Sequence, residues 1–224
     1  MRAVRPADLL DDGYLAERAR LIQRDRATDF AHGMPPSGGT IYLSAADEQG
    51  MMVSFIQSNY MGFGSGLVVP GIGVSLQNRG HCFSLDAAHP NVVAPGKRPF
   101  HTIIPAFLTR DGKPQMSFGV MGGNMQPQGH LQTLVRMLDY RQNPQAACDA
   151  PRWKVNRGLA VDVEPAMESE VTAELVRRGH ELVELSDSYM DFGSGQFIWR
   201  QSDDLEDGYA AASDSRREGQ AAGF

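Results

Sequence analysis

The spacing of apolar and polar residues divides the chain into an N-terminal helical stretch and a longer part that is rich in strands. Between residues 8 and 24, apolar side chains recur at helical spacing with charged residues between them, which predicts an amphipathic helix. These apolar residues are Leu9, Leu10, Tyr14, Leu15, Ala19 and Ile22. Residues 27–39 are rich in glycine and proline and predict a loop, which ends abruptly at Thr40.

From residue 40 onward the pattern is typical of strands. Residues 40–47 and 51–58 predict a hairpin around a turn at Glu48-Gln49-Gly50. Residues 102–110 and 115–120 predict a second hairpin around Asp111-Gly112. Further strands are expected at residues 161–164, 197–199 and 208–212. The glycine-rich residues 62–66 and the polar residues 81–99 predict connecting loops.

Helices are expected at three places between these strands. Apolar residues at positions 131, 134, 135 and 138 predict a helix after Gly122-Gly123-Asn124, and Asn143-Pro144 ends it before a further short helix. Residues 169–179 predict a helix that Gly179 ends. Hairpins with separate helices predict an α+β fold rather than alternating βαβ units.

Composition and charge exclude several classes of protein. A chain of 224 residues with 42% apolar residues can form one domain, or at most two small ones, with a core. The net charge of −6 without a basic run disfavours a nucleic-acid partner, and no apolar run reaches the ~18 residues that a membrane helix needs. Residues 1–6 lack the apolar core of a signal peptide, which favours a cytoplasmic location. Cys82 and Cys148 are expected to be buried free thiols rather than a disulfide.

Thr40 is the first candidate for chemistry, because Gly38-Gly39-Thr40 joins a loop to a strand. A threonine hydroxyl needs a base, and the threonine's own α-amine can serve once the preceding peptide bond is cut. That amine titrates near ~8 and is therefore available as a base at neutral pH. Taken alone, the same three residues are also typical of an ordinary turn before a strand.

Two further groups of residues could complete a site. Gly122-Gly123, between a strand and a helix, could present backbone N–H groups to a developing oxyanion, or could be a plain turn. Cationic and hydroxyl side chains near Arg79, His81, His101 and Thr102 could hold a carboxylate, or could form surface ion pairs. The histidines lack the paired spacing of metal ligands, so neither a metal nor another cofactor is expected.

These signals occur in an order that resembles the γ-glutamyltransferase family over nearly the whole chain. The residues that carry the resemblance are Thr40 with Asp47, Gly50, Ser58, Phe63-Gly64-Ser65-Gly66, Gly73, Asn78, Pro95 to Pro99, Gly122-Gly123, Ala150-Pro151-Arg152, Phe192-Gly193-Ser194-Gly195-Gln196 and Ser213-Asp214-Ser215-Arg216. The resemblance implies the four-layer αββα sandwich of N-terminal nucleophile hydrolases. Residues 1–39 would be the tail of the large-subunit region, and residues 40–224 the small, catalytic subunit.

The resemblance also implies a mechanism. An inactive precursor cleaves itself between Gly39 and Thr40, and Thr40 then cleaves an amide, as in glutathione hydrolysis, through an acyl-enzyme intermediate. Gly122 and Gly123 match the oxyanion glycines of the family. Ser58 stands where the family has a second threonine that hydrogen-bonds the amine of the nucleophile.

Some positions depart from the family pattern. Ile41-Tyr42 replaces Thr-His, and Tyr60 replaces an asparagine that assists the nucleophile. His81 takes the place of the acidic residue that grips the glutamyl α-amine, and His101-Thr102 replaces paired serines that bind the α-carboxylate. Because a carboxylate that pairs with an ammonium cannot simply be exchanged for histidine, these changes predict weak recognition of that amine. They favour an oxamate- or glutaryl-type amide, as in the oxamate amidohydrolase and cephalosporin acylase branch.

Three hypotheses therefore follow from the sequence. The first is a self-processing threonine amidohydrolase or acyltransferase with a small-molecule amide as substrate. The second is an inactive partial subunit that keeps the fold, and the third is a small-molecule binding module without turnover. Under the first hypothesis the partner is a large-subunit chain or segment of the same enzyme, and no nucleic acid or membrane is involved.

Overall fold

The computed structural model describes residues 11–20, 40–186 and 191–224. The chain divides into two compact units, residues 1–39 and residues 40–224. In the first unit, the described element is helix α2 (Asp12–Ala19), where a side-chain oxygen of Asp11 accepts a hydrogen bond from the N–H of Tyr14 at 2.7 Å. The predicted helix is confirmed over these residues, while its ends and the predicted loop at 27–39 lie outside the described residues.

The second unit begins with the predicted hairpin. Strands β1 (Ile41–Ala46) and β2 (Met52–Gln57) pair antiparallel, and Ile41 lies opposite Gln57. Asp47 shapes the turn, because its Oδ1 accepts hydrogen bonds from the N–H groups of Gln49 and Met51 at 3.0 and 2.9 Å. The hairpin prediction is confirmed.

Four antiparallel strands form the main sheet in the order β3-β4-β8-β9. They are β3 (Ala106–Arg110), β4 (Lys113–Val120), β8 (Gly195–Arg200) and β9 (Tyr209–Ser213), with the short 3-10 helix η3 (Leu205–Asp207) between the last two. The second predicted hairpin and the two C-terminal strands are confirmed. Strand β4 is buried over most of its length and is the centre of the core.

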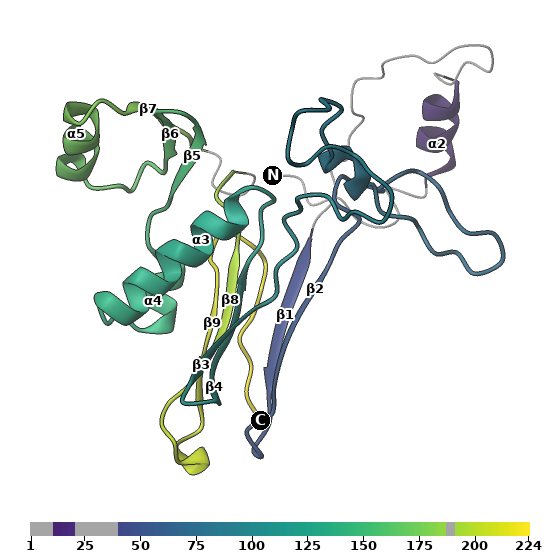
Figure 1. Ribbon diagram of the computed structural model, residues 1–224. Coiled ribbons are helices and arrows are strands. Elements are labelled where there is room, and N and C mark those ends of the chain that lie inside the picture. The colour runs from purple at the N-terminus through teal and green to yellow at the C-terminus, as the bar shows by residue number, and fades with distance from the viewer. Residues whose placement is uncertain (1–10, 21–39, 187–190) are drawn as a thin grey trace. The chain divides into compact units, whose positions relative to one another are not determined.

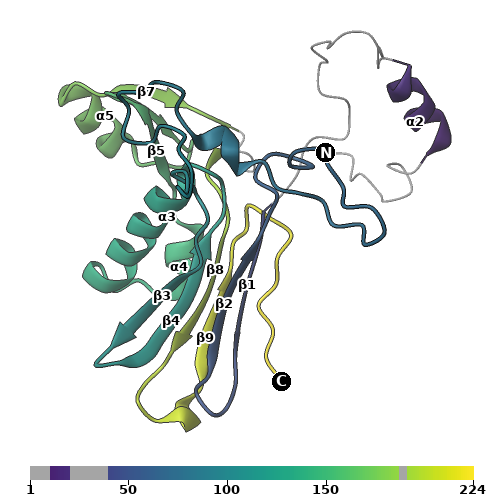
Figure 2. The same cartoon turned by 45° about the vertical axis from the view of Figure 1, so that its right-hand side comes forward.

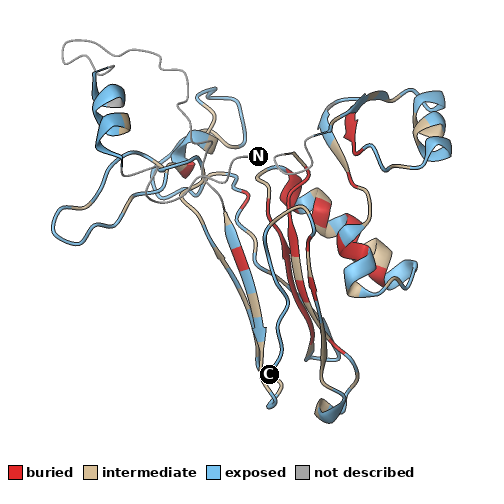
Figure 3. Cartoon of the chain, turned by 180° about the vertical axis from the view of Figure 1, so that it is seen from behind, coloured by how far each residue is buried: buried red, intermediate tan, exposed pale blue. Residues whose placement is uncertain are grey.

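Helices cover one face of the main sheet, and the β1–β2 hairpin packs on the other (Figures 1 and 2). The helical layer consists of α3 (Met125–Leu134), a π-helical turn η2 (Val135–Asp139) and α4 (Pro144–Asp149). Asn143 begins α4, since its Oδ1 accepts the N–H of Ala146 at 2.8 Å. Figure 3 shows the buried residues gathered where these helices meet the sheet. They include Met116, Phe118, Val120, Met137, Cys148 and Phe197.

The described part of residues 40–224 therefore holds three layers in the order helix, sheet, sheet, as expected for one half of an αββα sandwich. A smaller sheet adds β5 (Trp153–Arg157), β6 (Ala160–Val163) and β7 (Glu181–Glu184). Strands β6 and β7 are parallel and are joined through α5 (Ser169–Arg177). The predicted strand at residues 161–164 and the predicted helix at residues 169–179 are confirmed as β6 and α5. Strands β5 and β7, and with them the βαβ unit, were not predicted from the sequence. None of the helices that the structure describes is long and apolar enough to span a bilayer.

Candidate active site

Thr40 and Ser58 occupy neighbouring positions at the open end of the β1–β2 hairpin. The register of the hairpin ends with Ile41 opposite Gln57, so the next residues beyond the strands, Thr40 and Ser58, are expected to lie opposite each other. Side chains alternate between the faces of a strand, so both lie on the same face as Tyr42, which points toward the main sheet. Directly opposite residues typically have Cβ atoms about 5 Å apart, which brings their hydroxyl groups within reach of each other. Thr40 itself is half-buried.

The Gly122-Gly123 turn lies between the end of β4 and the start of α3. Gly122 has a φ of +119° and Gly123 a φ of +58°. Their carbonyl groups accept the N–H groups of Met125 and Gln126 at 3.1 and 3.0 Å, which begins the helix. Among the described residues, none accepts a hydrogen bond from the N–H groups of the two glycines. Within the described ranges, the turn therefore offers two N–H donors without an acceptor beside a helix N-terminus, an arrangement that suits an anion.

Contacts between the hairpin and the main sheet bring Thr40 and this turn to the same end of the sandwich. Ser44 on β1 contacts Ser117 on β4, with 2.6 Å between the Oγ atoms. The ring of Tyr42 lies over Gly119, where an added Cβ would be 2.7 Å from two ring carbons. Moving two residues toward the start of β1, from Ser44 to Tyr42, therefore corresponds to moving two residues toward the end of β4, from Ser117 to Gly119. If this relation continues for one more step, Thr40 is expected opposite Met121, the residue before Gly122.

Arg79 contacts Ser58 and adds a positive charge to the candidate site. It begins the short 3-10 helix η1 (Arg79–Cys82) and is 8% exposed. Its guanidinium donates to the Oγ of Ser58 at 2.5 Å and to the Ser58 carbonyl at 3.1 Å. The Nε group of Arg79 is buried and finds no hydrogen-bond acceptor among the described residues. Within the residues that the structure describes, no carboxylate forms an ion pair with Arg79, so the site contains a buried cation without a counterion.

Tyr60 lies beside this cation. The guanidinium carbon of Arg79 is 5.9 Å from the centre of the Tyr60 ring, a cation–π distance. Tyr60 has a φ of +79°, a backbone conformation that is uncommon for residues other than glycine. A hydrogen bond with Cys82 and partial burial raise the pKa of Tyr60, so its hydroxyl is neutral at physiological pH.

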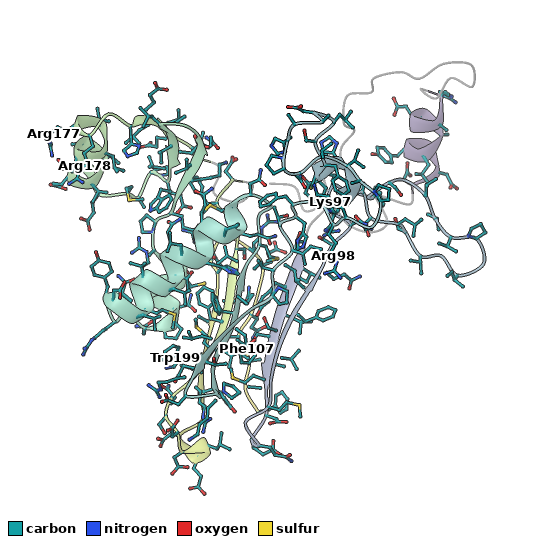
Figure 4. All side chains as sticks on the ribbon, in the orientation of Figure 1. Lys97, Arg98, Phe107, Arg177, Arg178 and Trp199 are labelled. Carbon is teal, nitrogen blue, oxygen red and sulfur yellow. The ribbon has the colours of Figure 1, made fainter. Side chains whose placement is uncertain are left out.

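The other sequence-predicted binding residues are not joined to this group. His81 and His101 are exposed, and the His101 Nδ1 accepts the N–H of Ile103 at 3.2 Å. Thr102 is buried, and no described hydrogen bond connects it to Ser58 or Arg79. The nearby cations Lys97 and Arg98 are exposed on the connecting loop (Figure 4), where the Lys97 Nζ donates to a backbone carbonyl at 2.5 Å. The structure thus joins Ser58, Tyr60 and Arg79 by direct contacts. Among the described contacts, none joins His81, His101 or Thr102 to this group, although His81 shares the helix η1 with Arg79.

A buried ionic network lies next to the Gly122-Gly123 turn. No role was predicted for it from the sequence. Asp214 pairs with Arg152 at 2.6 Å and with Arg216 at 3.0 Å, and its Oδ2 also accepts the N–H of Gly195 at 2.8 Å. Although burial alone raises the pKa of Asp214, the two arginines lower it below the ordinary value. Arg216 also binds Glu164 at 2.5 Å.

This network is connected to the Gly122 turn through residues 192–195. Arg152 donates to the Phe192 carbonyl at 2.9 Å, and the Ser194 carbonyl accepts the N–H of Met121 at 2.8 Å. A Cβ on Gly122 would lie 2.8 Å from the Cα of Gly193. The sequence motifs at 150–152 and 213–216 had marked the ends of the network. Its ion pairs Arg152–Asp214 and Glu164–Arg216 join residues that lie 62 and 52 positions apart.

A polar cavity of about 280 Å³ adjoins the same turn. It is lined by Gly122, Asn124, Met125, Lys154, Val155, Asn156 and Asp191. Lys154 contributes an ammonium group that pairs with Asp191 at 2.9 Å and with Asp162 at 3.3 Å. The place of Lys154 at this cavity was not predicted, because a lone lysine on a strand carries no local signal for burial.

The remaining titratable candidates have structural partners. The Nε2 of His130 accepts the N–H of Val120 at 3.0 Å, and burial lowers the pKa of this histidine to about 4. Both cysteines are free thiols; Cys148 is buried as expected, while Cys82 is half-buried. Burial raises the pKa of Cys148, so this thiol is unreactive. No cluster of metal-binding side chains occurs in the described ranges.

The sequence is similar to known enzymes over nearly its whole length. Residues 2–224 match the family described as Gamma-glutamyltranspeptidase. The oxamate amidohydrolase proenzyme of Klebsiella pneumoniae is 36% identical over 221 residues, which cover 96% of this chain and 41% of that protein. The glutathione hydrolase-like YwrD proenzyme of Bacillus subtilis is 46% identical over 123 residues, which cover 55% of this chain and 23% of that protein. The chain thus spans less than half the length of these relatives.

Solved structures have the same fold. The cephalosporin acylase of Bacillus halodurans is 50% identical with a TM-score of 0.76, and the match covers 99% of this chain and 40% of that one. The W525D mutant of gamma-glutamyltranspeptidase from Pseudomonas nitroreducens is 25% identical with a TM-score of 0.69, and the match covers 82% of this chain and 98% of that one. The three-layer arrangement is therefore that of the N-terminal nucleophile hydrolases, and the chain belongs to the gamma-glutamyltranspeptidase family.

Proposed function

We propose that residues 40–224 are the small, catalytic subunit of a threonine amidase that frees Thr40 by cleaving the bond after Gly39. The proposal is supported by the register of β1 with β2 and by its contacts with β4, which direct Thr40, Ser58 and the Gly122-Gly123 turn toward one end of the sandwich. A hydroxyl nucleophile, a hydroxyl beside its amine and two free N–H donors are the groups that acyl transfer needs. A plain turn before a strand would account for none of this convergence.

The proposed reaction has two steps. The free α-amine of Thr40 takes the proton of the Thr40 hydroxyl, whose oxygen attacks the amide carbonyl of the substrate. The N–H groups of Gly122 and Gly123 stabilise the oxyanion that forms, and the amine leaves with a proton. Water, or an acceptor amine, then attacks the acyl-Thr40 ester and releases the acid or a new amide. Ser58 holds the amine of Thr40 through its hydroxyl.

The buried cation favours an acyl group that carries a carboxylate. Arg79 is buried and gains no counterion from the described residues, and a buried charge is costly unless a ligand supplies the opposite charge. Its guanidinium lies at Ser58, next to the proposed nucleophile. By the resemblance to the family, the position that would bind a glutamyl α-amine carries His81 instead of an acidic side chain. A glutaryl- or oxamate-type amide therefore fits better than a γ-glutamyl amide, which is the alternative substrate.

An exposed apolar face supports a large-subunit partner. The side of the hairpin that faces away from the main sheet carries Ile41, Leu43, Val53 and Phe55, each 44–58% exposed. Figure 3 shows exposed residues alternating with less exposed ones along this hairpin. Apolar faces of this kind are normally covered in a stable protein. We infer that a large-subunit chain or segment packs on it. The match to nearly all of a separate chain of the Pseudomonas enzyme favours the same division at residue 40.

Substrate preference tests the acyl part of the proposal. The chain is produced with its large-subunit region, and hydrolysis is measured with glutaryl-p-nitroanilide, γ-glutamyl-p-nitroanilide and oxamate. Glutaryl-p-nitroanilide or oxamate is expected to give the highest kcat/KM. A clear preference for the γ-glutamyl compound would contradict the proposed lack of an amine subsite.

The variant Arg79→Met tests the proposed carboxylate partner. Loss of a hydrogen bond to a charged group costs about 1.5–3 kcal/mol, so kcat/KM for glutaryl-p-nitroanilide is expected to fall about 10- to 100-fold. Valeryl-p-nitroanilide has the same chain length without the carboxylate, and its kcat/KM is expected to fall much less. Arg98→Met removes an exposed cation of the same type and serves as the control. Equal losses for both substrates would assign Arg79 to structure alone.

A further inference from the structure

Tyr42 fills the space between the two sheets close to the proposed nucleophile. It is 3% exposed, and its ring lies against Gly119 on β4. A Cβ at that position would lie 2.7 Å from the Cδ2 and Cε2 atoms of the ring, a distance that real Cβ atoms do not tolerate. The backbone of Gly119 does not have a positive φ, so glycine is needed here for space rather than for conformation. Tyr42 and Gly119 therefore form a size-matched contact.

The hydroxyl of Tyr42 joins three strands. Its oxygen is 2.6 Å from the Oγ of Ser54 on β2, and that Oγ is 2.8 Å from the carbonyl oxygen of Ala106 at the start of β3. Each hydroxyl has one hydrogen, so Ser54 donates to the carbonyl and Tyr42 donates to Ser54. Burial raises the pKa of Tyr42, which keeps this donor protonated. The bonds hold the hairpin at a fixed position on the main sheet.

Both halves of this contact lie a short distance from the proposed catalytic groups. Tyr42 follows Thr40 by two residues, and Gly119 precedes Gly122 by three. Because β1 and β4 run in opposite directions across the sandwich, the step from Tyr42 to Thr40 and the step from Gly119 to Gly122 lead toward the same end of it. We propose that Tyr42 is a positioning residue, which sets the separation between Thr40 and the Gly122 turn. This inference rests on the proposed function, in which Thr40 is the nucleophile and the turn binds the oxyanion.

A comparison of Tyr42→Phe with Ser44→Ala tests the role of the hydroxyl. Ser44 makes the same kind of bond between the sheets, to the Oγ of Ser117 at 2.6 Å, but lies four residues from Thr40. Tyr42→Phe keeps the ring and loses the hydroxyl. In the processed enzyme with its large-subunit region, Tyr42→Phe is expected to lower kcat about tenfold with KM changed less than about twofold, since small displacements of reacting groups have such effects. Ser44→Ala is expected to leave kcat within about twofold.

Equal losses of kcat in the two variants, or an unchanged kcat in Tyr42→Phe, would overturn the inference. Thermal unfolding of both variants provides the second measurement, because a merely structural role predicts that kcat follows stability. The proposed role predicts similar losses of stability and different losses of kcat. An inactive wild-type enzyme that is also uncleaved before Thr40 would overturn the proposed function itself, and this inference with it.

A double-mutant cycle tests the size-matched contact independently. Gly119→Ala pushes the Tyr42 ring away from β4, so it is expected to lower kcat by about as much as Tyr42→Phe. In a Tyr42→Ala background the ring is gone, and the same glycine substitution is expected to have little further effect on kcat. Additive losses of kcat in the double variant would mean that Gly119 does not act through Tyr42.

Discussion

The substitution Gly122→Ala, set against Gly123→Ala, tests the geometry of the proposed oxyanion turn. Gly122 has a φ of +119°, which an alanine adopts at a cost of about 1–3 kcal/mol. Its new Cβ would also lie 2.8 Å from the Cα of Gly193, so backbone must shift at a further cost of about 1–3 kcal/mol. The Gly122 variant is therefore expected to lose about 4 kcal/mol of unfolding free energy.

Gly123 provides the matched comparison. Its φ of +58° lies in the left-handed region that alanine reaches for about 1–2 kcal/mol, and no atom lies within 4 Å of the position of an added Cβ. Urea unfolding of the processed enzyme is expected to give a free-energy loss about 2–3 kcal/mol larger for Gly122→Ala than for Gly123→Ala. If the two variants are equally stable, the close approach of residues 122 and 193 is wrong.

Two further predictions concern buried ionisable groups. Because burial lowers the pKa of His130 to about 4, its neutral form stabilises the fold fully above pH ~6.5, and this contribution is lost as the pH falls from ~6.5 to ~4. The loss of unfolding free energy is on the order of 3 kcal/mol. It is expected to be absent in His130→Gln, which retains an acceptor for the Val120 N–H. Equal acid sensitivity of the wild-type protein and this variant in unfolding experiments would contradict the prediction. Asp214→Asn leaves Arg152 and Arg216 buried without full pairing. Urea unfolding is therefore expected to show a loss of about 3–5 kcal/mol in the free energy of unfolding. A loss below about 1 kcal/mol would mean that the network is open to water.

Much of the fold could be predicted because its signals are local. The alternation around residues 40–58 and the turn at Asp111-Gly112 define both hairpins without reference to the rest of the chain. Strand β7 was missed because it contains few apolar residues and begins and ends with glutamate. It forms through parallel pairing with β6, a contact across the intervening helix that no short stretch of sequence encodes.

The candidate site was predictable in its backbone and less so in its side chains. Thr40, Ser58 and Gly122-Gly123 were found from their order along the chain. The burial of Arg79 was not, because an arginine next to a glycine is usually on the surface, and only the fold brings it to Ser58. Likewise, no local pattern relates Tyr42 to Gly119, since they lie on strands of two different sheets.

The most direct test of the account is the intact mass of the protein produced together with its large-subunit region. Cleavage between Gly39 and Thr40 is expected in the wild-type protein, giving a fragment that begins with Thr40. Thr40→Ala is expected to remain uncleaved and inactive, whereas Thr40→Ser is expected to be cleaved more slowly, because a hydroxyl is retained. A wild-type chain that stays intact, or a Thr40→Ala chain that is cut at the same bond, would contradict the assignment of Thr40 as the nucleophile.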